Sequence, residues 1–189
     1  MTDATVRIAT ADDASTIAAI QVRTWRAAYA EALGRATVDA LDEDALAAEW
    51  ATAVTHPGST VLVALEGATV VGFCAAGPAP RDDVAAADDS LPADADTVAL
   101  VSTVLVEPRW GRRGHGGRLF GTAATALRAD GHTRGITWTA QSDSASLSFF
   151  RSVGWNPDGT VRTLDTGERT VRELRLTGGL DVRFTDADD

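Results

Sequence analysis

Apolar positions in the first third of the chain repeat with the spacing of one helix face. Two triplets carry this pattern: Val22, Trp25 and Tyr29, and then Leu46, Trp50 and Val54. The spacing predicts a first helix that ends near Gly34 and a second helix that ends at residues 56–58. A short β-prone run at residues 6–9 precedes them, and Thr10, three residues before Asp13, is typical of a helix start.

After residue 60 the pattern changes to continuous apolar, β-branched runs. Residues 61–65 and 69–76 are two such runs joined by a glycine-containing turn, which predicts a hairpin. Residues 98–106 are almost unbroken in their apolar character, as expected of a strand that is covered on both faces. Further patterns predict a helix with Leu119, Ala123 and Leu127 on one face, a strand at 136–140, a helix at 144–153, and a closing hairpin of 161–164 and 171–176. The order β-α-α-β-β-β-α-β-α-β-β defines a mixed α/β layer structure.

The segment between residues 78 and 96 interrupts these patterns. It contains three prolines and six aspartates against one arginine. This composition predicts a solvated, partly disordered excursion between two strands that is mobile and contributes little to the core. We expect a single domain over residues 1–178, because no composition shift resembles a linker, and a loose acidic tail at 179–189.

The charge balance restricts the partners of the protein. Its net charge is −10, and all 17 basic residues are arginine. An acidic chain repels phosphate backbones, so we expect no nucleic-acid binding, and the phosphate-binding P-loop is excluded because it requires a lysine. The three histidines lack metal-ligand spacing, so no metal is expected. A single cysteine, the absence of a membrane-length apolar run and an N-terminus without a leader pattern predict a cytoplasmic protein without membrane contact.

One segment inverts the acidic character of the chain. Residues 104–120 run from the end of the predicted 98–106 strand through a glycine-dense turn into an amphipathic helix. No acidic residue occurs between Pro108 and Ala129. The turn and the start of the helix contain four arginines: Arg109, Arg112, Arg113 and Arg118. Glycines let backbone N–H groups converge, and a helix N-terminus favours an anion. The segment therefore predicts a phosphate site at residues 111–117.

Other interpretations of this turn explain less. A turn that is merely solvated would account for a lone Gly-x-Gly, but not for a strand end, a helix start and arginines in one place. A Rossmann dinucleotide site fails on pattern, because Leu119 stands where the third glycine, counted from Gly114, should be. An α/β-hydrolase is also excluded, since the chain has no Gly-x-Ser-x-Gly element.

The segment resembles the acetyl-CoA motif of the GCN5-related N-acetyltransferase (GNAT) family, in which Leu-x-Val-x-Pro precedes Gln/Arg-x-x-Gly-x-Gly/Ala. Val104–Pro108 matches the first part except for its leading valine, and Gly111–Gly116 matches the second with glycine at the Gln/Arg position. Residues 20–29 are similar to the first helix of the family. Residues 143–155 resemble its Asn-x-x-Ala-x-x-Phe-Tyr-x-x-x-Gly-Phe helix. The resemblance implies a mixed, mostly antiparallel central sheet with flanking helices.

The resemblance also implies an acetyl-CoA-dependent N-acetyltransferase in which the acceptor amine attacks the thioester directly. The pyrophosphate would rest on the turn and the pantetheine along the preceding strand, and the amide of Val106 would donate to the thioester carbonyl. This assigns cofactor contacts to Val104, Leu105, Val106, Arg112, Arg113, Gly114, His115, Gly116, Gly117, Asp143 and Phe150. The tyrosine that usually protonates the thiolate is replaced here by Phe150.

Several roles stay open from sequence. Ser146, one turn before Phe150, could face the thiol, although its position taken alone favours an exposed helix serine. Glu107 could accept a proton through water, and a solvated strand-end charge explains it equally well. Trp25 and Tyr29 are assigned to the acceptor pocket, against the alternative of core packing. The acceptor is an amine of a small molecule or a peptide, and a homodimer is left open. The alternatives are an acetyl-CoA-binding module without turnover, suggested by Phe150, and a plain interaction protein, which the arginine–glycine turn disfavours.

Overall fold

A single mixed sheet organises the protein, which a computed structural model describes over residues 4–182. Seven strands are hydrogen-bonded in the order β1-β2-β3-β4-β5-β7-β6. They are β1 (Ala4–Ile8), β2 (Thr60–Glu66), β3 (Thr69–Pro78), β4 (Val98–Val106), β5 (Arg134–Ala140), β6 (Asn156–Asp165) and β7 (Thr170–Gly179). Every neighbouring pair is antiparallel except β4 and β5, which run parallel. The predicted mostly antiparallel sheet is confirmed.

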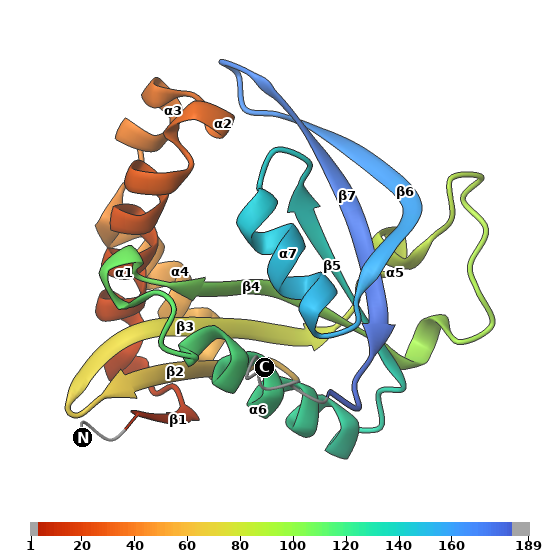
Figure 1. The fold of residues 1–189 in the computed structure, drawn as a ribbon, viewed down its shortest axis with the longest axis horizontal. Helices are drawn as coiled ribbons and strands as arrows, with labels where there is room; N and C mark the ends of the chain where they lie inside the picture. The colour runs from red at the N-terminus through yellow and green to blue at the C-terminus, as the bar shows by residue number, and fades with distance from the viewer. Residues whose placement is uncertain (1–3, 183–189) are drawn as a thin grey trace, which may run out of the picture.

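Helices cover both faces of this sheet (Figure 1). They are α1 (Ala14–Ala28), α2 (Ala30–Leu33), α3 (Arg35–Asp39), α4 (Glu43–Thr55), α5 (Arg81–Val84), α6 (His115–Ala129) and α7 (Ser144–Ser152). Phe120 of α6 and Phe150 of α7 pack with Leu176 in one core. Ile17 of α1 packs with Phe73 of β3 in another core. These clusters place α6 and α7 on one face and α1 and α4 on the opposite face.

The predicted elements are present, with three short helices added. The predicted strand at 98–106 coincides with β4, and the apolar face of Leu119, Ala123 and Leu127 is buried in α6. The first helix does not continue to Gly34 as expected. It ends at Ala28, because Tyr29 leaves the helical conformation at φ −115° and ψ 2°, and α2 and α3 follow after it.

Strands β4 and β5 separate soon after they begin. Their pairing is limited to Val98–Leu100 against Arg134–Ile136. Beyond Leu100 the second half of β4 keeps β3 as its only neighbouring strand, and Figure 1 shows β4 and β5 diverging from their shared end. Val101 O still accepts from Thr137 Oγ1 of β5 at 2.8 Å, so the backbone of β4 is open along one edge from residue 102 onward, in the middle of the sheet.

The acidic segment between β3 and β4 packs against the sheet at its ends, which contradicts the expectation that it contributes little to the core, while residues 86–91 between these ends are exposed. Val84 of α5 is 2% exposed and contacts the buried Val98 and Ile136. Its composition suggested that the segment is too polar to bury apolar area. The side chain of Val84, on the one-turn helix α5, is nevertheless buried and anchors the segment on the sheet.

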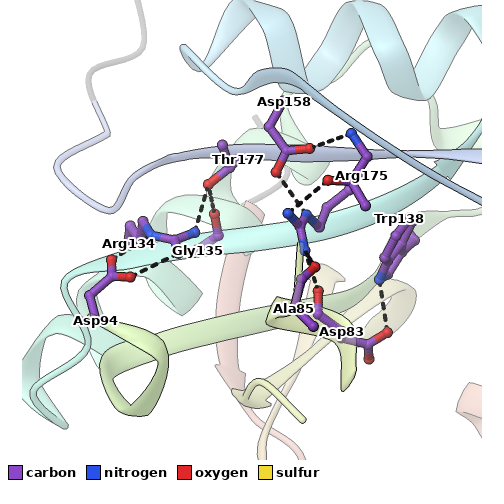
Figure 2. A network of polar contacts seen from close by, with 10 residues as sticks. Asp83, Ala85, Asp94, Arg134, Gly135, Trp138, Asp158, Arg175 and Thr177 are labelled. Atoms are coloured by element: carbon purple, nitrogen blue, oxygen red, sulfur yellow. Dashed lines mark hydrogen bonds and ion pairs between the residues drawn. The ribbon is translucent and has the colours of Figure 1, made fainter. Parts of the chain in front are cut away.

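Polar contacts fix both ends of the same segment to the C-terminal strands (Figure 2). The guanidinium of Arg175 donates to the carbonyl oxygens of Asp83 and Ala85 at 2.9 and 2.7 Å, and also to the carboxylate of Asp158 at 2.7 Å. Arg134 holds Asp94 with two hydrogen bonds of 2.6 and 3.1 Å. The aspartates that suggested a solvated loop are thus in part the anchors of an ordered one.

The fold also continues beyond residue 178, where the tail was expected to begin. Strand β7 extends to Gly179, and Leu180 is 3% exposed within the core shared with α6 and α7. Residues 183–189 of the expected tail lie outside the described residues. Over residues 4–182 no helix is long and apolar enough to cross a membrane.

Candidate active site

The glycine-rich turn after β4 exposes a row of backbone amides. Strand β4 is followed by a 3-10 turn (Pro108–Trp110), and α6 begins at His115. Arg112 and Gly114 between them have φ values of 61° and 77°, a left-handed conformation that reverses the chain. Within residues 4–182, the amides of residues 112–117 donate to no backbone or side-chain acceptor, and the first helical bond is that of Arg118 to Gly114. Six consecutive amides at a helix N-terminus suit a phosphate group.

The arginines of the turn have different surroundings. Arg112 lines the cavity next to the turn. Arg113 does not, because its guanidinium lies 3.6 Å from Glu66 and stacks over Trp110 at 4.8 Å. The cofactor contact assigned to Arg113 is therefore left to its backbone amide. Arg118 donates to the carbonyl of Arg113 at 2.9 Å and so fastens the turn to the first turn of α6.

His115 contributes its backbone to the turn while its side chain is buried below it. The imidazole is fully enclosed, and its Nε2 atom lies 2.8 Å from Glu66 Oε2 at the end of β2. The angle of this contact does not meet hydrogen-bond geometry, and neither ring nitrogen has another partner among residues 4–182. The side chain is thus a packing contact between the turn and β2, and only the amide faces the phosphate position.

A cavity of about 750 Å³ extends from the turn along β4 to α7. Glu107 N donates to Val71 O at 2.9 Å, so this amide points toward β3. Because successive residues of a strand direct their amides to opposite edges, those of Val104 and Val106 point away from β3, toward the open edge. Val104, Leu105 and Val106 all line the cavity, and an extended ligand could pair with β4 there as an added strand.

A smaller cavity of about 210 Å³ lies against the opposite side of this edge. Its walls come from α1 and α2 with Trp25 and Leu33, and from the C-terminal strands with Trp138 and Glu173. The two cavities share seven lining residues: Tyr29, Ala32, Val104, Leu105, Asp143, Ser146 and Phe150. The separation of β4 from β5 therefore connects two compartments through the sheet.

Three polar side chains meet at this junction. Asp143 caps α7 by accepting from the amide of Ser146 at 3.0 Å, and its Oδ2 atom accepts from the hydroxyls of Tyr29 and Ser146, both at 2.7 Å. Burial and the neighbouring Asp143 carboxylate raise the pKa of Tyr29 to about 12. Sequence analysis placed Tyr29 only in the acceptor pocket, because Tyr29 and Asp143 are 114 positions apart.

Glu107 does not fit its expected role as a base. It lines neither cavity, and its two oxygens accept from Arg23 at 2.7 Å and from Arg109 at 3.0 Å. Burial opposes ionisation of Glu107, but the hydrogen bonds and charges of the two arginines outweigh it, so its pKa is lowered. A carboxylate held by two guanidinium groups is a structural clamp between α1 and the turn.

Phe150 is a member of an aromatic cluster as well as a lining residue. It is 5% exposed and stacks on Trp155 at 5.8 Å, while Phe120 and Phe149 meet it edge to face. Its ring borders both cavities and carries no hydroxyl. Across residues 4–182 no group of three or more histidine, cysteine, aspartate or glutamate side chains is arranged to hold a metal ion.

This fold and site define an enzyme that transfers an acyl group from a coenzyme A thioester. The sequence profile of the acetyltransferase (GNAT) family matches residues 19–155, so the chain belongs to that family. The predicted acetyl-CoA-dependent N-acetyltransferase class is confirmed at this level, with acetyl-CoA as its co-substrate. No curated protein sequence matches the chain.

Solved structures with this fold cover nearly the whole chain. PaiA N-acetyltransferase from Thermoplasma acidophilum, in complex with coenzyme A, is 15% identical with a TM-score of 0.70, over 94% of this chain and 99% of that one. The protein yncA from Salmonella typhimurium, with its cofactor acetyl-CoA, is 20% identical with a TM-score of 0.67, over 98% and 99%. Ribosomal-protein-S18-alanine N-acetyltransferase from Escherichia coli is 14% identical with a TM-score of 0.62, over 99% and 100%.

Proposed function

We propose that this protein is a catalytically active N-acetyltransferase whose acceptor amine attacks acetyl-CoA directly at the junction of the two cavities. The observation that carries the proposal is the meeting of Tyr29, Asp143 and Ser146 where the larger and the smaller cavity join. Acetyl-CoA supplies the activated acyl group, and the protein supplies position, electrostatics and proton transfer.

The turn and β4 hold the co-substrate. The amides of residues 112–117 and the side chain of Arg112 receive the pyrophosphate, and the open edge of β4 pairs with the pantetheine arm. The amide of Val106 points into the open edge and donates to the thioester carbonyl oxygen, on which negative charge develops during attack. Gly116 and Gly117 keep side chains away from the phosphate position.

Protons move through Asp143. The amine nitrogen forms its bond to the acyl carbon and releases one proton, while the carbon–sulfur bond breaks and the sulfur requires one. Asp143 accepts the amine proton, and Tyr29 passes its own phenolic proton to the sulfur and is reprotonated by Asp143 at the 2.7 Å contact. With a pKa of about 12, Tyr29 would be a poor acid alone, so this return of a proton avoids a costly phenolate. Ser146 can serve as the proton donor in place of Tyr29, since its hydroxyl also donates to Asp143 Oδ2.

Steady-state thiol release with a panel of amines tests the proposal. Tyr29→Phe should lower kcat by roughly 10²-fold, because the general acid is lost, with coenzyme A affinity unchanged. Asp143→Asn should lower kcat at least as much, because an amide cannot carry the proton. Ser146→Ala should cost less, and Ser148→Ala, which alters an exposed serine of the same helix, should cost nothing.

Two results would contradict the proposal in different ways. An unchanged kcat in both Tyr29→Phe and Asp143→Asn would rule out the proposed proton relay but not the acetyltransferase activity. Absence of turnover by the wild-type protein with every amine, despite coenzyme A binding, would favour the binding module that Phe150 suggests.

A further inference from the structure

The smaller cavity has a one-sided charge. Its lining residues include the carboxylates of Asp143 and Glu173 and no arginine, lysine or histidine from the described part of the chain. The remaining wall includes the aromatic rings of Trp25, Trp138 and Phe150, together with aliphatic and hydroxyl side chains. A cavity with apolar sides and carboxylates on two separate elements, β7 and the cap of α7, suits a ligand with an apolar middle and positive charge.

Glu173 has an oxygen left for a ligand. Its Oε2 atom accepts from Arg162 Nε at 2.6 Å, whereas its Oε1 atom accepts no hydrogen bond from any residue in 4–182. Its side chain is 15% exposed, so it is largely screened from bulk water. The guanidinium of Arg162 is not committed to Glu173 alone. It also donates to Asp83 at 2.9 Å and stacks over Trp138 at 4.3 Å. One guanidinium thus faces two carboxylates, and the region keeps a net negative charge.

The cavity lies beside a contact between two elements, and its small volume limits the size of the acceptor. The tip of the β6–β7 hairpin reaches α2, as Figure 1 shows, where Thr166 Oγ1 donates to Leu33 O at 2.9 Å and Arg169 donates to Glu31 O at 2.9 Å. Leu33 of α2 and Leu164 below the hairpin tip both line the cavity. The hairpin and α2 therefore meet beside the cavity, and its volume of about 210 Å³ is small for a peptide.

We propose that the acceptor is a compact aliphatic amine that carries a second cationic group, such as a short diamine. The second group binds Glu173 Oε1, and the reacting amine reaches Tyr29 and Asp143 at the junction with the larger cavity. The methylene chain between them lies against the aromatic walls. This inference rests on the proposed function and adds the substrate class to it.

Four acceptors with the same four-carbon chain and a primary amine at one end isolate the role of the group at the other end. They are 1,4-diaminobutane, 4-aminobutan-1-ol, 1-aminobutane and 4-aminobutanoate, whose far ends are positive, neutral and polar, apolar, and negative. In the wild-type protein, kcat/KM for the diamine should exceed that of the alcohol by roughly tenfold or more, chiefly through KM, because a charged hydrogen bond is formed. The carboxylate should be the poorest acceptor.

Substitutions at the far end separate charge from shape. Glu173→Gln keeps the acceptor for Arg162 but loses the charge, and should lower the diamine-to-alcohol ratio by roughly tenfold while leaving coenzyme A affinity unchanged. Arg162→Gln removes the competing cation and should raise the ratio. Glu49→Gln removes an equal charge from the exposed face of α4 and should change nothing. Comparing ratios between variants cancels differences in the intrinsic reactivity of the amines.

Each remaining outcome is decisive. Equal use of the diamine and the alcohol by the wild-type protein, or a ratio that Glu173→Gln does not change, would overturn the diamine class while leaving an active acetyltransferase. Peptide amines that outcompete all four compounds would assign the cavity to a protein N-terminus instead. A wild-type protein inactive with every amine and peptide would overturn the proposed function itself.

Discussion

Tyr29, Asp143 and Ser146 form the polar centre of the candidate site, and hydrogen bonds to Asp143 hold the three side chains together. Asp143 accepts a hydrogen bond of 2.7 Å from each of the two hydroxyls, so neither hydroxyl lacks a partner at the junction. The hydroxyl that the family resemblance would place at position 150 is absent, and Phe150 packs in an aromatic cluster instead. The hydroxyl of Tyr29, the residue that follows α1, lies at the same junction. In the proposed mechanism, proton donation thus depends on a local arrangement of groups rather than on one position of α7.

The ion pair of Arg7 and Asp13 gives a prediction about stability and pH. Asp13 accepts from Thr10 N at 2.8 Å in the capping box of the 3-10 turn (Ala11–Asp13) that precedes α1, and it accepts two hydrogen bonds from Arg7 at 2.7 and 2.8 Å. Hydrogen bonding to Arg7 is the main cause that lowers the pKa of Asp13 from 3.8 to about 2. Because the pKa is depressed in the folded state, the stabilisation is complete above pH 3.8 and is lost as pH falls through about 2.

Asp13→Asn should therefore lower the free energy of unfolding by about 1–2 kcal/mol at pH 7, with allowance for solvent screening of the half-exposed Arg7. Urea titrations at pH 7, 4 and 2 should show this difference shrinking only at the lowest pH. Asp12→Asn, at the exposed neighbouring position, is the control. A difference that persists unchanged at pH 2 would show that the carboxylate charge is not its source.

At the scale of elements, the acidic segment between β3 and β4 acts as a brace across the C-terminal strands. Its α5 turn inserts Val84 into a small core, and its backbone carbonyls are held by the guanidinium of Arg175. Asp83 accepts from Trp138 at 3.0 Å and from Arg162 at 2.9 Å. Trp138 lines the smaller cavity, and Arg162 donates to Glu173, which lines it too. The brace thus fixes the wall of the cavity from outside the sheet.

Arg175→Met should destabilise the protein by about 2–4 kcal/mol, because it breaks four hydrogen bonds of a buried guanidinium and leaves Asp158 without its cation. Arg172→Met, at an exposed position of the same strand, should have little effect. Thermal unfolding of both variants measures the difference. Equal melting temperatures would mean that the segment is held by apolar contacts alone.

At the scale of the whole molecule, the sheet consists of two parts that are joined at one end. Strands β1 to β4 and strands β5, β7 and β6 are connected through three residue pairs between β4 and β5. The cavity assigned to acetyl-CoA takes residues from both parts, with the turn and β4 on one side and α7 on the other. A bound co-substrate therefore links the two parts and should stabilise the entire fold.

Coenzyme A at a concentration of about 100 times its Kd should raise the free energy of unfolding by about 2.7 kcal/mol and the melting temperature by roughly 5–10 °C. Gly116→Glu should abolish this shift, because it places an anion against the pyrophosphate position. The variant should fold, since a Cβ atom there would make an ordinary 3.6 Å contact with Phe149 and an acid suits the first turn of a helix.

Thr125→Glu adds the same charge at an exposed position later in α6 and serves as the control. It should keep the stabilisation by coenzyme A. An unchanged shift in a folded Gly116→Glu variant would show that the pyrophosphate does not rest on residues 112–117.

Local regularities in the sequence determined most of the fold. The period of apolar residues identified α1, α4, α6 and both hairpins, because burial of one helix face or of a strand requires that period wherever the element lies. The family resemblance then implied the mostly antiparallel sheet, and the glycine–arginine turn predicted a phosphate position. These properties depend on neighbours within a few residues along the chain, so the sequence alone contains them.

The tertiary structure alone decided which distant side chains meet. Hydrogen bonds between Tyr29 and Asp143, and between Arg175 and the backbone at Asp83, join residues separated by 114 and 92 positions. The spacing of apolar residues along the chain does not indicate such pairs. The same limit explains the errors: Glu107 was considered without Arg23, which lies 84 positions away, and the acidic segment without the arginines that neutralise it. A charged or hydroxyl side chain acquires its role from partners that the fold brings to it, whereas an apolar side chain needs only to be buried.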